Sequence, residues 1–81
     1  MSKLKKMSGD DVITLLGQYG FAAPERKGPH VKLRRNVGRG VTQSITFPRA
    51  KELDPLALTA ILRYAGQYIP EERLRSRFYT E

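Results

Sequence analysis

His30 is the only histidine of the chain, and it lies inside a long basic stretch. An imidazole can accept and release a proton near neutral pH, and fixed cations stabilise the charge of a phosphate group. His30 is therefore a candidate general base, and the basic stretch predicts a polyanionic partner, with RNA or DNA as the first candidates. Positions 26 to 51 contain eight lysine and arginine residues and no acidic residue: Arg26, Lys27, Lys32, Arg34, Arg35, Arg39, Arg49 and Lys51.

The composition excludes several other kinds of site. The rest of the chain holds seven basic and eight acidic residues, so the formal net charge of +7 comes from this one stretch. Without cysteine the chain can form no disulfide, no CxxC redox pair and no thiolate zinc site, and a single histidine argues against a histidine-rich metal site. We therefore expect no metal and no small-molecule cofactor. The lack of cysteine and of long apolar runs predicts a cytoplasmic protein with no signal peptide and no membrane segment.

Two alternating segments predict how His30 and its neighbours are positioned. Across residues 30–35, Val31 and Leu33 alternate with polar residues, so they should face a core while His30, Lys32 and Arg34 share the opposite, wet face. A glycine-containing loop over 36–40 predicts a hairpin. In the following strand, 41–47, three residues are expected to face inward and three outward: Val41, Ile45 and Phe47, against Thr42, Ser44 and Thr46.

A weaker strand is predicted over residues 21–27, just before this hairpin. Pro24 restricts it to a sheet edge or a bulge, because proline cannot donate a backbone hydrogen bond. Gly28 and Pro29 then predict a turn that leads into His30. Three strands are therefore expected, with a polar surface that extends over the two later ones.

Helices are predicted before and after the strands along the chain. Ser8 and Asp11 have the spacing of a capping box, and Gly20 is placed for a left-handed residue after the helix. Asp54 followed by Pro55 predicts a second helix start, and a short helix follows Pro70. The order predicts an α+β fold with helices on one sheet face and the other face open. Residues 1–6 are expected to form a basic flexible tail, and residues 7–81 a single domain. The apolar stripes of the two longer helices are Val12, Leu15, Leu16 and Tyr19, and Leu58, Ile61, Leu62 and Ala65.

Three segments, in this order and spacing, resemble the HicA (YcfA-like) mRNA interferase toxin family of type II toxin-antitoxin systems. Residues 8–21 resemble the opening helix of the family, which ends in a Gly-Phe pair. Lys27-Gly28-Pro29-His30 resembles its lysine-glycine-serine-histidine turn, with proline in place of serine. Residues 52–55 and 60–66 resemble the signature of its second helix, so the resemblance covers roughly residues 7–72.

The resemblance implies a fold and an activity. The expected fold is double-stranded-RNA-binding-domain-like, α-β-β-β-α with a short C-terminal helix and an antiparallel three-stranded sheet. The expected activity is metal-independent cleavage of messenger RNA, neutralised by a HicB-like antitoxin. His30 falls on the position of the family's catalytic histidine.

Cleavage of an RNA phosphodiester needs a base for the 2′-hydroxyl proton and cations near the phosphate. His30 suits the first task, and the expected RNA-binding residues are Lys27, Gly28, Lys32, Arg34 and Arg49. Two other functions stay open. The chain could be a non-catalytic RNA-binding module on the same fold, or a basic domain that docks an acidic protein.

Overall fold

The computed structural model describes residues 3–80, and for residues 23–27 it describes the backbone alone. The predicted order of helix, three strands, helix and short helix is confirmed, with one additional short strand near each end of the chain. The protein is therefore of the α+β class. The elements are β1 (Lys3–Leu4), α1 (Gly9–Gly17), β2 (Ala22–Lys27), β3 (His30–Asn36), β4 (Thr42–Pro48), α2 (Pro55–Ala65), α3 (Glu71–Phe78) and β5 (Tyr79–Thr80).

Side-chain caps start α1 and α2 where the sequence predicts them. The Ser8 hydroxyl accepts a hydrogen bond from the backbone N–H of Asp11 at 3.0 Å, and the Asp11 carboxylate accepts one from the N–H of Ser8 at 2.9 Å. At α2, the Asp54 carboxylate accepts from the N–H of Ala57 at 2.8 Å, and Pro55 occupies the first turn. These bonds satisfy donors that have no partner within a helix, so they fix where each helix begins.

Strands β2, β3 and β4 form an antiparallel sheet in that order, with β3 in the centre. The register of β3 with β4 runs without interruption from the His30–Pro48 pair to the Asn36–Thr42 pair. This regular ladder fixes which side chains of the two strands share a face, because residues aligned across neighbouring strands point to the same side.

The pairing of β2 with β3 is less regular. Its register shifts between Ala22 and Glu25, and β2 lies at the edge of the sheet, which confirms the prediction that Pro24 restricts this strand to an edge or a bulge. Gly28 and Pro29 form the turn to β3, and Gly28 has φ +60°, a conformation that suits the first central residue of a tight hairpin turn.

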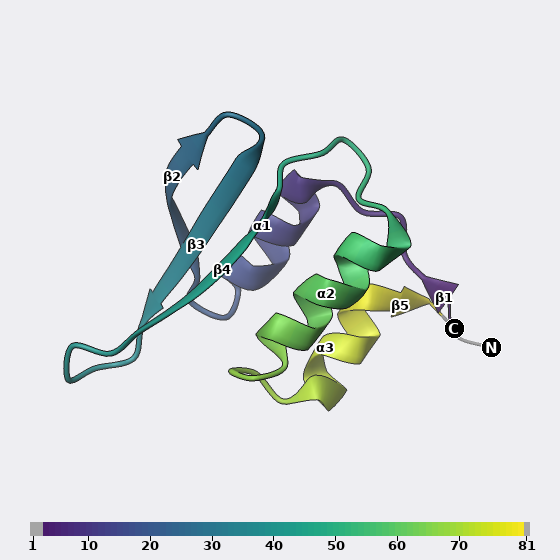
Figure 1. The fold of residues 1–81 in the computed structure, drawn as a ribbon. Helices are drawn as coiled ribbons and strands as arrows, with labels where there is room; N and C mark the ends of the chain where they lie inside the picture. The colour runs from purple at the N-terminus through teal and green to yellow at the C-terminus, as the bar shows by residue number, and fades with distance from the viewer. Residues whose placement is uncertain (1–2, 81) are drawn as a thin grey trace.

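The core lies between one face of this sheet and the helices (Figure 1). α1 packs on β2, and α2 packs on β4 and α3. The sheet contributes alternate residues of its two regular strands, each at most 2% exposed: Val31, Leu33, Ile45 and Phe47. The helices contribute the predicted buried stripes, although Tyr19 is only partly buried. No described helix covers the other face of the sheet, which stays open (Figure 1).

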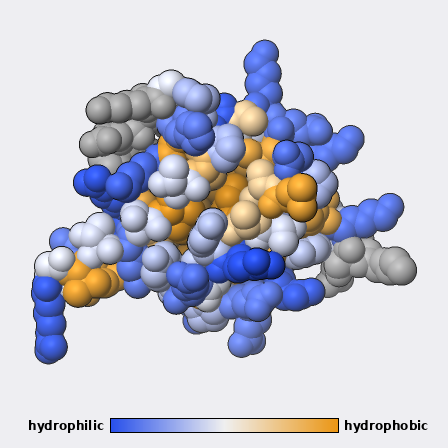
Figure 2. All heavy atoms as spheres, in the orientation of Figure 1, coloured by the Kyte–Doolittle hydropathy of each residue, from blue (hydrophilic) through white to orange (hydrophobic). Residues whose placement is uncertain are grey.

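The hairpin between β3 and β4 extends past the helices (Figure 1). The prediction that Val41 faces inward is wrong, because β4 begins at Thr42 and Val41 belongs to the loop, where it is 54% exposed. Val37 is 48% exposed, and its backbone N–H donates to the carbonyl of Val41 at 3.1 Å. Figure 2 shows apolar atoms at this tip. The alternation of inward and outward residues in β4 therefore begins only after the loop, at Thr42.

The two ends of the described chain meet in a second, two-stranded sheet. β1 pairs antiparallel with β5, with Lys3 aligned to Thr80, and the N–H of Lys5 donates to the carbonyl of Phe78 at 2.8 Å. The predicted flexible tail over residues 1–6 is therefore wrong from Lys3 onward, while residues 1–2 lie outside the described part. The expectation of one three-stranded sheet is incomplete for the same reason, since β1 and β5 form a separate sheet.

Arg35 connects four parts of the fold. Its Nε and one Nη donate to the side-chain oxygen of Gln43 at 3.0 and 2.6 Å, and its Nη groups also reach the carbonyls of Tyr19 at 3.0 Å and Tyr68 at 3.3 Å. Its guanidinium carbon lies 4.9 Å from the ring centroid of Phe21, close enough for a cation–π contact. The side chain of Arg35 therefore lies on the helix side of β3, where it stabilises the fold.

Candidate nucleic-acid interface

Three side chains of β3 share the open face of the sheet. His30, Lys32 and Arg34 alternate with the buried Val31 and Leu33; His30 and Arg34 are exposed and Lys32 is half-buried. Alternate residues of a strand lie about 7 Å apart, so these three positions span roughly 13 Å. Among the described side chains, none of the three has a hydrogen-bond or ion-pair partner. The structure thus brings these three predicted residues together on one face of β3.

Strand β4 adds polar groups to the same face. Hydroxyl groups can donate to phosphate and sugar oxygens, so the hydroxyls of Ser44 and Thr46, next to β3, suit a nucleic-acid backbone. The β4 residues of this face are all exposed. The aligned pairs are His30 with Pro48, Lys32 with Thr46 and Arg34 with Ser44.

Strand β2 brings one basic and one acidic position into line with β3. Its register aligns Lys27 with His30 and Glu25 with Lys32. Glu25 is not among the residues predicted for the site, because it lies immediately before the stretch that contains no acid. The signal that identifies it is the two-residue turn at 28–29, which fixes the hairpin register and so aligns residue 25 with residue 32.

Arg49 lies beside the turn but does not join the open face. Its backbone N–H donates to the carbonyl of Pro29 at 2.6 Å, so the end of β4 is held next to the start of β3. Its side chain turns towards α1, where Nε lies 3.2 Å from a carboxylate oxygen of Asp10. The alternation of a strand accounts for this, because Pro48 shares the face of His30 and the next residue points to the helix side. The structure therefore groups His30 with Lys32 and Arg34 and separates Arg49 from them.

The start of α1 packs directly on the end of β4. The N–H of Gly9 donates to the carbonyl of Ala50 at 2.8 Å. A Cβ atom on residue 9 would lie only 2.9 Å from the Cα of Arg49 and 3.1 Å from the carbonyl oxygen of Pro48. Both are backbone atoms, so the position requires glycine if α1 is to approach this closely.

Replacing Gly9 by alanine should therefore destabilise the protein by about 1–3 kcal/mol, the usual cost of overpacking. Urea unfolding followed by circular dichroism measures the change. Gly17→Ala is the matched control, because a Cβ at that position meets no atom within 4 Å. That variant should be neutral or stabilised by up to about 1 kcal/mol. Equal stability of the two variants would contradict the close approach at Gly9.

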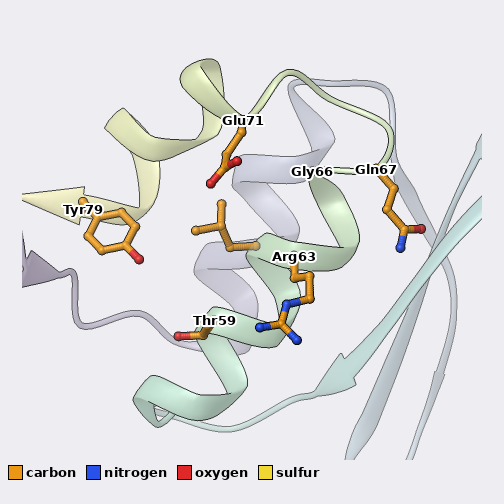
Figure 3. A pocket seen from close by; sticks show the side chains of 7 residues that line it. Thr59, Arg63, Gly66, Gln67, Glu71 and Tyr79 are labelled. Carbon is orange, nitrogen blue, oxygen red and sulfur yellow. The ribbon is translucent and has the colours of Figure 1, made fainter.

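A separate hollow of about 430 Å³ lies on the helical side, between α2, α3 and β5 (Figure 3). Glu71 and Tyr79 point into it from α3 and β5 (Figure 3). Glu71 also lies 3.6 Å from Arg75, and the Thr59 hydroxyl donates to the carbonyl of Pro55 at 2.7 Å. The hollow contains no residue of the open sheet face, so it is unrelated to the predicted site. It is lined by Thr59, Leu62, Arg63, Gly66, Gln67, Glu71 and Tyr79.

Two further findings concern metals and membranes. Within the described part of the chain, no group of three or more histidine, aspartate or glutamate side chains lies close enough together to hold a metal ion. None of the described helices has the length and apolar character needed to cross a membrane.

A comparison with protein families gives a match over residues 9–67, from the start of α1 to just beyond α2. The matching model describes the HicA toxin of bacterial toxin-antitoxin systems. The chain belongs to the HicA toxin family. No curated protein and no solved structure matches it significantly.

Membership of the HicA family confirms the resemblance predicted from the three sequence segments. It makes this protein a toxin of a toxin-antitoxin system, and it implies an antitoxin as a partner. The matched region contains every predicted site residue, whereas β1, α3 and β5 lie outside it.

Proposed function

We propose that this HicA toxin is a metal-independent endoribonuclease that cleaves messenger RNA, with His30 as its catalytic residue. The observation that carries the proposal is the exposed position of His30 at the end of an uncovered sheet face, beside Lys32 and without a partner among the described side chains. The order α1-β2-β3-β4-α2 supports a double-stranded-RNA-binding-domain-like scaffold. A small fold with one open face can present a base and cations to RNA without a deep pocket.

In the proposed step, the unprotonated imidazole of His30 takes the proton of a ribose 2′-hydroxyl. The 2′-oxygen attacks the adjacent phosphorus, the bond from phosphorus to the 5′-oxygen breaks, and the leaving oxygen takes a proton from water. The hydroxide left behind takes the proton from the imidazolium, which restores His30. The products are a 2′,3′-cyclic phosphate and a 5′-hydroxyl end. Lys32, about 7 Å along the strand, stabilises the charge that gathers on the phosphate, because a fixed cation needs no reorganisation during the reaction.

The remaining proposed contacts come from the turn before His30 and from two arginines, Arg34 and Arg49. Gly28 lets the backbone approach a phosphate closely because it has no side chain. Lys27 is aligned with His30, and Arg34 is placed for a second phosphate. A phosphate bound by Arg49 would compete with the exposed ion pair between Arg49 and Asp10.

The proposed partner is a HicB-like antitoxin that covers the open face. Because this face carries the cations Lys32 and Arg34, the antitoxin is expected to present acidic residues there. Such a complex would exclude RNA by occupying the same surface.

The test is incubation of the purified protein with a long single-stranded RNA in EDTA. We expect cleavage products with 2′,3′-cyclic phosphate and 5′-hydroxyl ends, which end-labelling with and without phosphatase treatment identifies. Cleavage that requires an added divalent metal, or 3′-hydroxyl ends, would contradict the proposed step.

A non-catalytic RNA-binding module is the second candidate function, and Pro29 favours it. A proline in the turn removes a backbone N–H that could hold the substrate phosphate. This alternative predicts RNA binding that weakens steeply with salt and gives no cleavage products. A protein-interaction domain, the third candidate, predicts no appreciable RNA affinity even at low salt.

A further inference from the structure

Among the side chains that the structure describes, the cations of the open face extend from His30 in one direction only. His30 is the first residue of β3, and Lys32 and Arg34 follow it along the strand towards the hairpin loop. Arg39, which is exposed, lies in that loop. On this side of His30, the described cations are therefore Lys32, Arg34 and Arg39.

The other side of His30 is different. Beyond the turn, the next described cation is Arg49, which is already bound to Asp10. Lys51 follows in the loop between β4 and α2, which passes the start of α1 (Figure 1). That loop is held by backbone hydrogen bonds from Gly9 to Ala50 at 2.8 Å and from Leu53 to Met7 at 2.7 Å. It therefore leads away from the open face.

We propose that the open face binds single-stranded RNA asymmetrically along β3. The reacting phosphate lies at His30, and the nucleotides on one side of it lie over Lys32 and Arg34 and run towards the hairpin. The position of the reacting phosphate rests on the proposed ribonuclease function, whereas the binding track does not.

The spacing of the track suits an extended single strand. Its cations repeat about every 7 Å along a strand, a distance comparable with that between neighbouring phosphates of an extended RNA chain. The exposed hydroxyls of Thr46 and Ser44 run parallel to Lys32 and Arg34. Among the described side chains of this face, His30 is the only aromatic ring, so these side chains offer no aromatic platform for bases. Binding should therefore depend on the sugar-phosphate backbone and tolerate different sequences.

The test uses oligouridylates with 2′-O-methyl groups, which cannot be cleaved by attack of the 2′-oxygen. A nitroxide placed at the 5′ end or at the 3′ end of an octanucleotide broadens the amide NMR signals of nearby residues. We expect one labelled end to broaden signals of residues 34–36 and of the hairpin loop, and the opposite end to broaden signals of the turn before His30. Equal broadening at both places by both labels, or broadening centred on the helical side, would overturn the proposal.

Arg34→Ala tests the far part of the track. It should weaken binding of the octanucleotide by roughly 5-fold. The slope of the logarithm of the binding constant against the logarithm of the salt concentration should fall by the equivalent of about one phosphate contact. A dinucleotide should bind as before. Lys51→Ala is the matched control, because it removes one exposed cation of the same basic stretch from the other side of His30, and it should leave both affinities unchanged. An equal loss in both variants would point to general attraction and overturn the track.

The two proposals fail in different ways. If the protein does not cleave RNA but the labels and Arg34→Ala behave as expected, the ribonuclease proposal fails and the track stands. If the protein cleaves RNA and Arg34→Ala binds the octanucleotide like the unchanged protein, the track fails and the ribonuclease proposal stands.

Discussion

Replacement of His30 by alanine is expected to lower the rate of RNA cleavage by about 10²- to 10⁴-fold, the usual contribution of a general base. His30 is exposed and has no partner among the described side chains, so the fold should lose less than about 0.5 kcal/mol. Cleavage of a long single-stranded RNA in EDTA, measured beside urea unfolding of the same preparation, checks both expectations.

The control for this experiment is His30→Gln, which keeps a polar side chain but cannot exchange a proton near neutral pH. It should bind RNA like the unchanged protein and cleave as poorly as His30→Ala. Arg73→Ala, on the exposed surface of α3, should cleave normally. Full cleavage by His30→Ala would remove His30 from the mechanism.

Replacement of Arg35 by alanine is expected to have the largest effect on stability, a loss of about 2–3 kcal/mol. The change removes the hydrogen bonds to Gln43 and to the carbonyls of Tyr19 and Tyr68, and it removes the cation over Phe21. For a domain of this size, the loss corresponds to a decrease in Tm of roughly 10–20 °C. Thermal unfolding followed by circular dichroism measures it.

The neighbouring residue provides the matched control for Arg35. Arg34→Ala removes the same side chain one residue away, on the open face, and should change stability by less than about 0.5 kcal/mol. Arg35→Lys keeps the charge but not the planar fork, so it should restore only a small part of the stability. If Arg34→Ala and Arg35→Ala destabilise the protein equally, the contacts of Arg35 do not have the proposed importance.

The sequence could predict the parts of this fold that depend on neighbouring residues. The capping box at Ser8 and the aspartate cap at Asp54 were identifiable because each cap acts within one turn of helix. The open face of β3 was predictable because alternation is a local property of a strand. Gly20 has φ +92°, as expected for a glycine that follows a helix.

The features that the sequence could not predict depend on contacts between distant segments. The β1–β5 pairing joins Lys3 to Thr80, and strands of two residues have no periodic pattern to detect. The ion pair between Asp10 and Arg49 needs the relative placement of α1 and β4. These long-range pairings follow from the assembled core, so residue spacing along the chain gives no sign of them.

The candidate site shows the same division. Composition identified the basic stretch, and alternation selected His30, Lys32 and Arg34 from it. Neither could assign Arg35 to the fold, because its role depends on the carbonyl groups of Tyr19 and Tyr68. Both residues are remote from Arg35 in the sequence. A basic residue on the helix side of a strand is therefore expected to stabilise the fold, as Arg35 does, rather than to bind a ligand.

The pairing of β1 with β5 also has a practical consequence. Residues 3 and 80 lie side by side, on the side of the molecule away from the three-stranded sheet (Figure 1). A dye, an affinity tag or a surface tether attached near either terminus would leave the open face of the three-stranded sheet clear. A short peptide bridge between the termini would likewise produce a cyclic toxin whose open sheet face is unchanged.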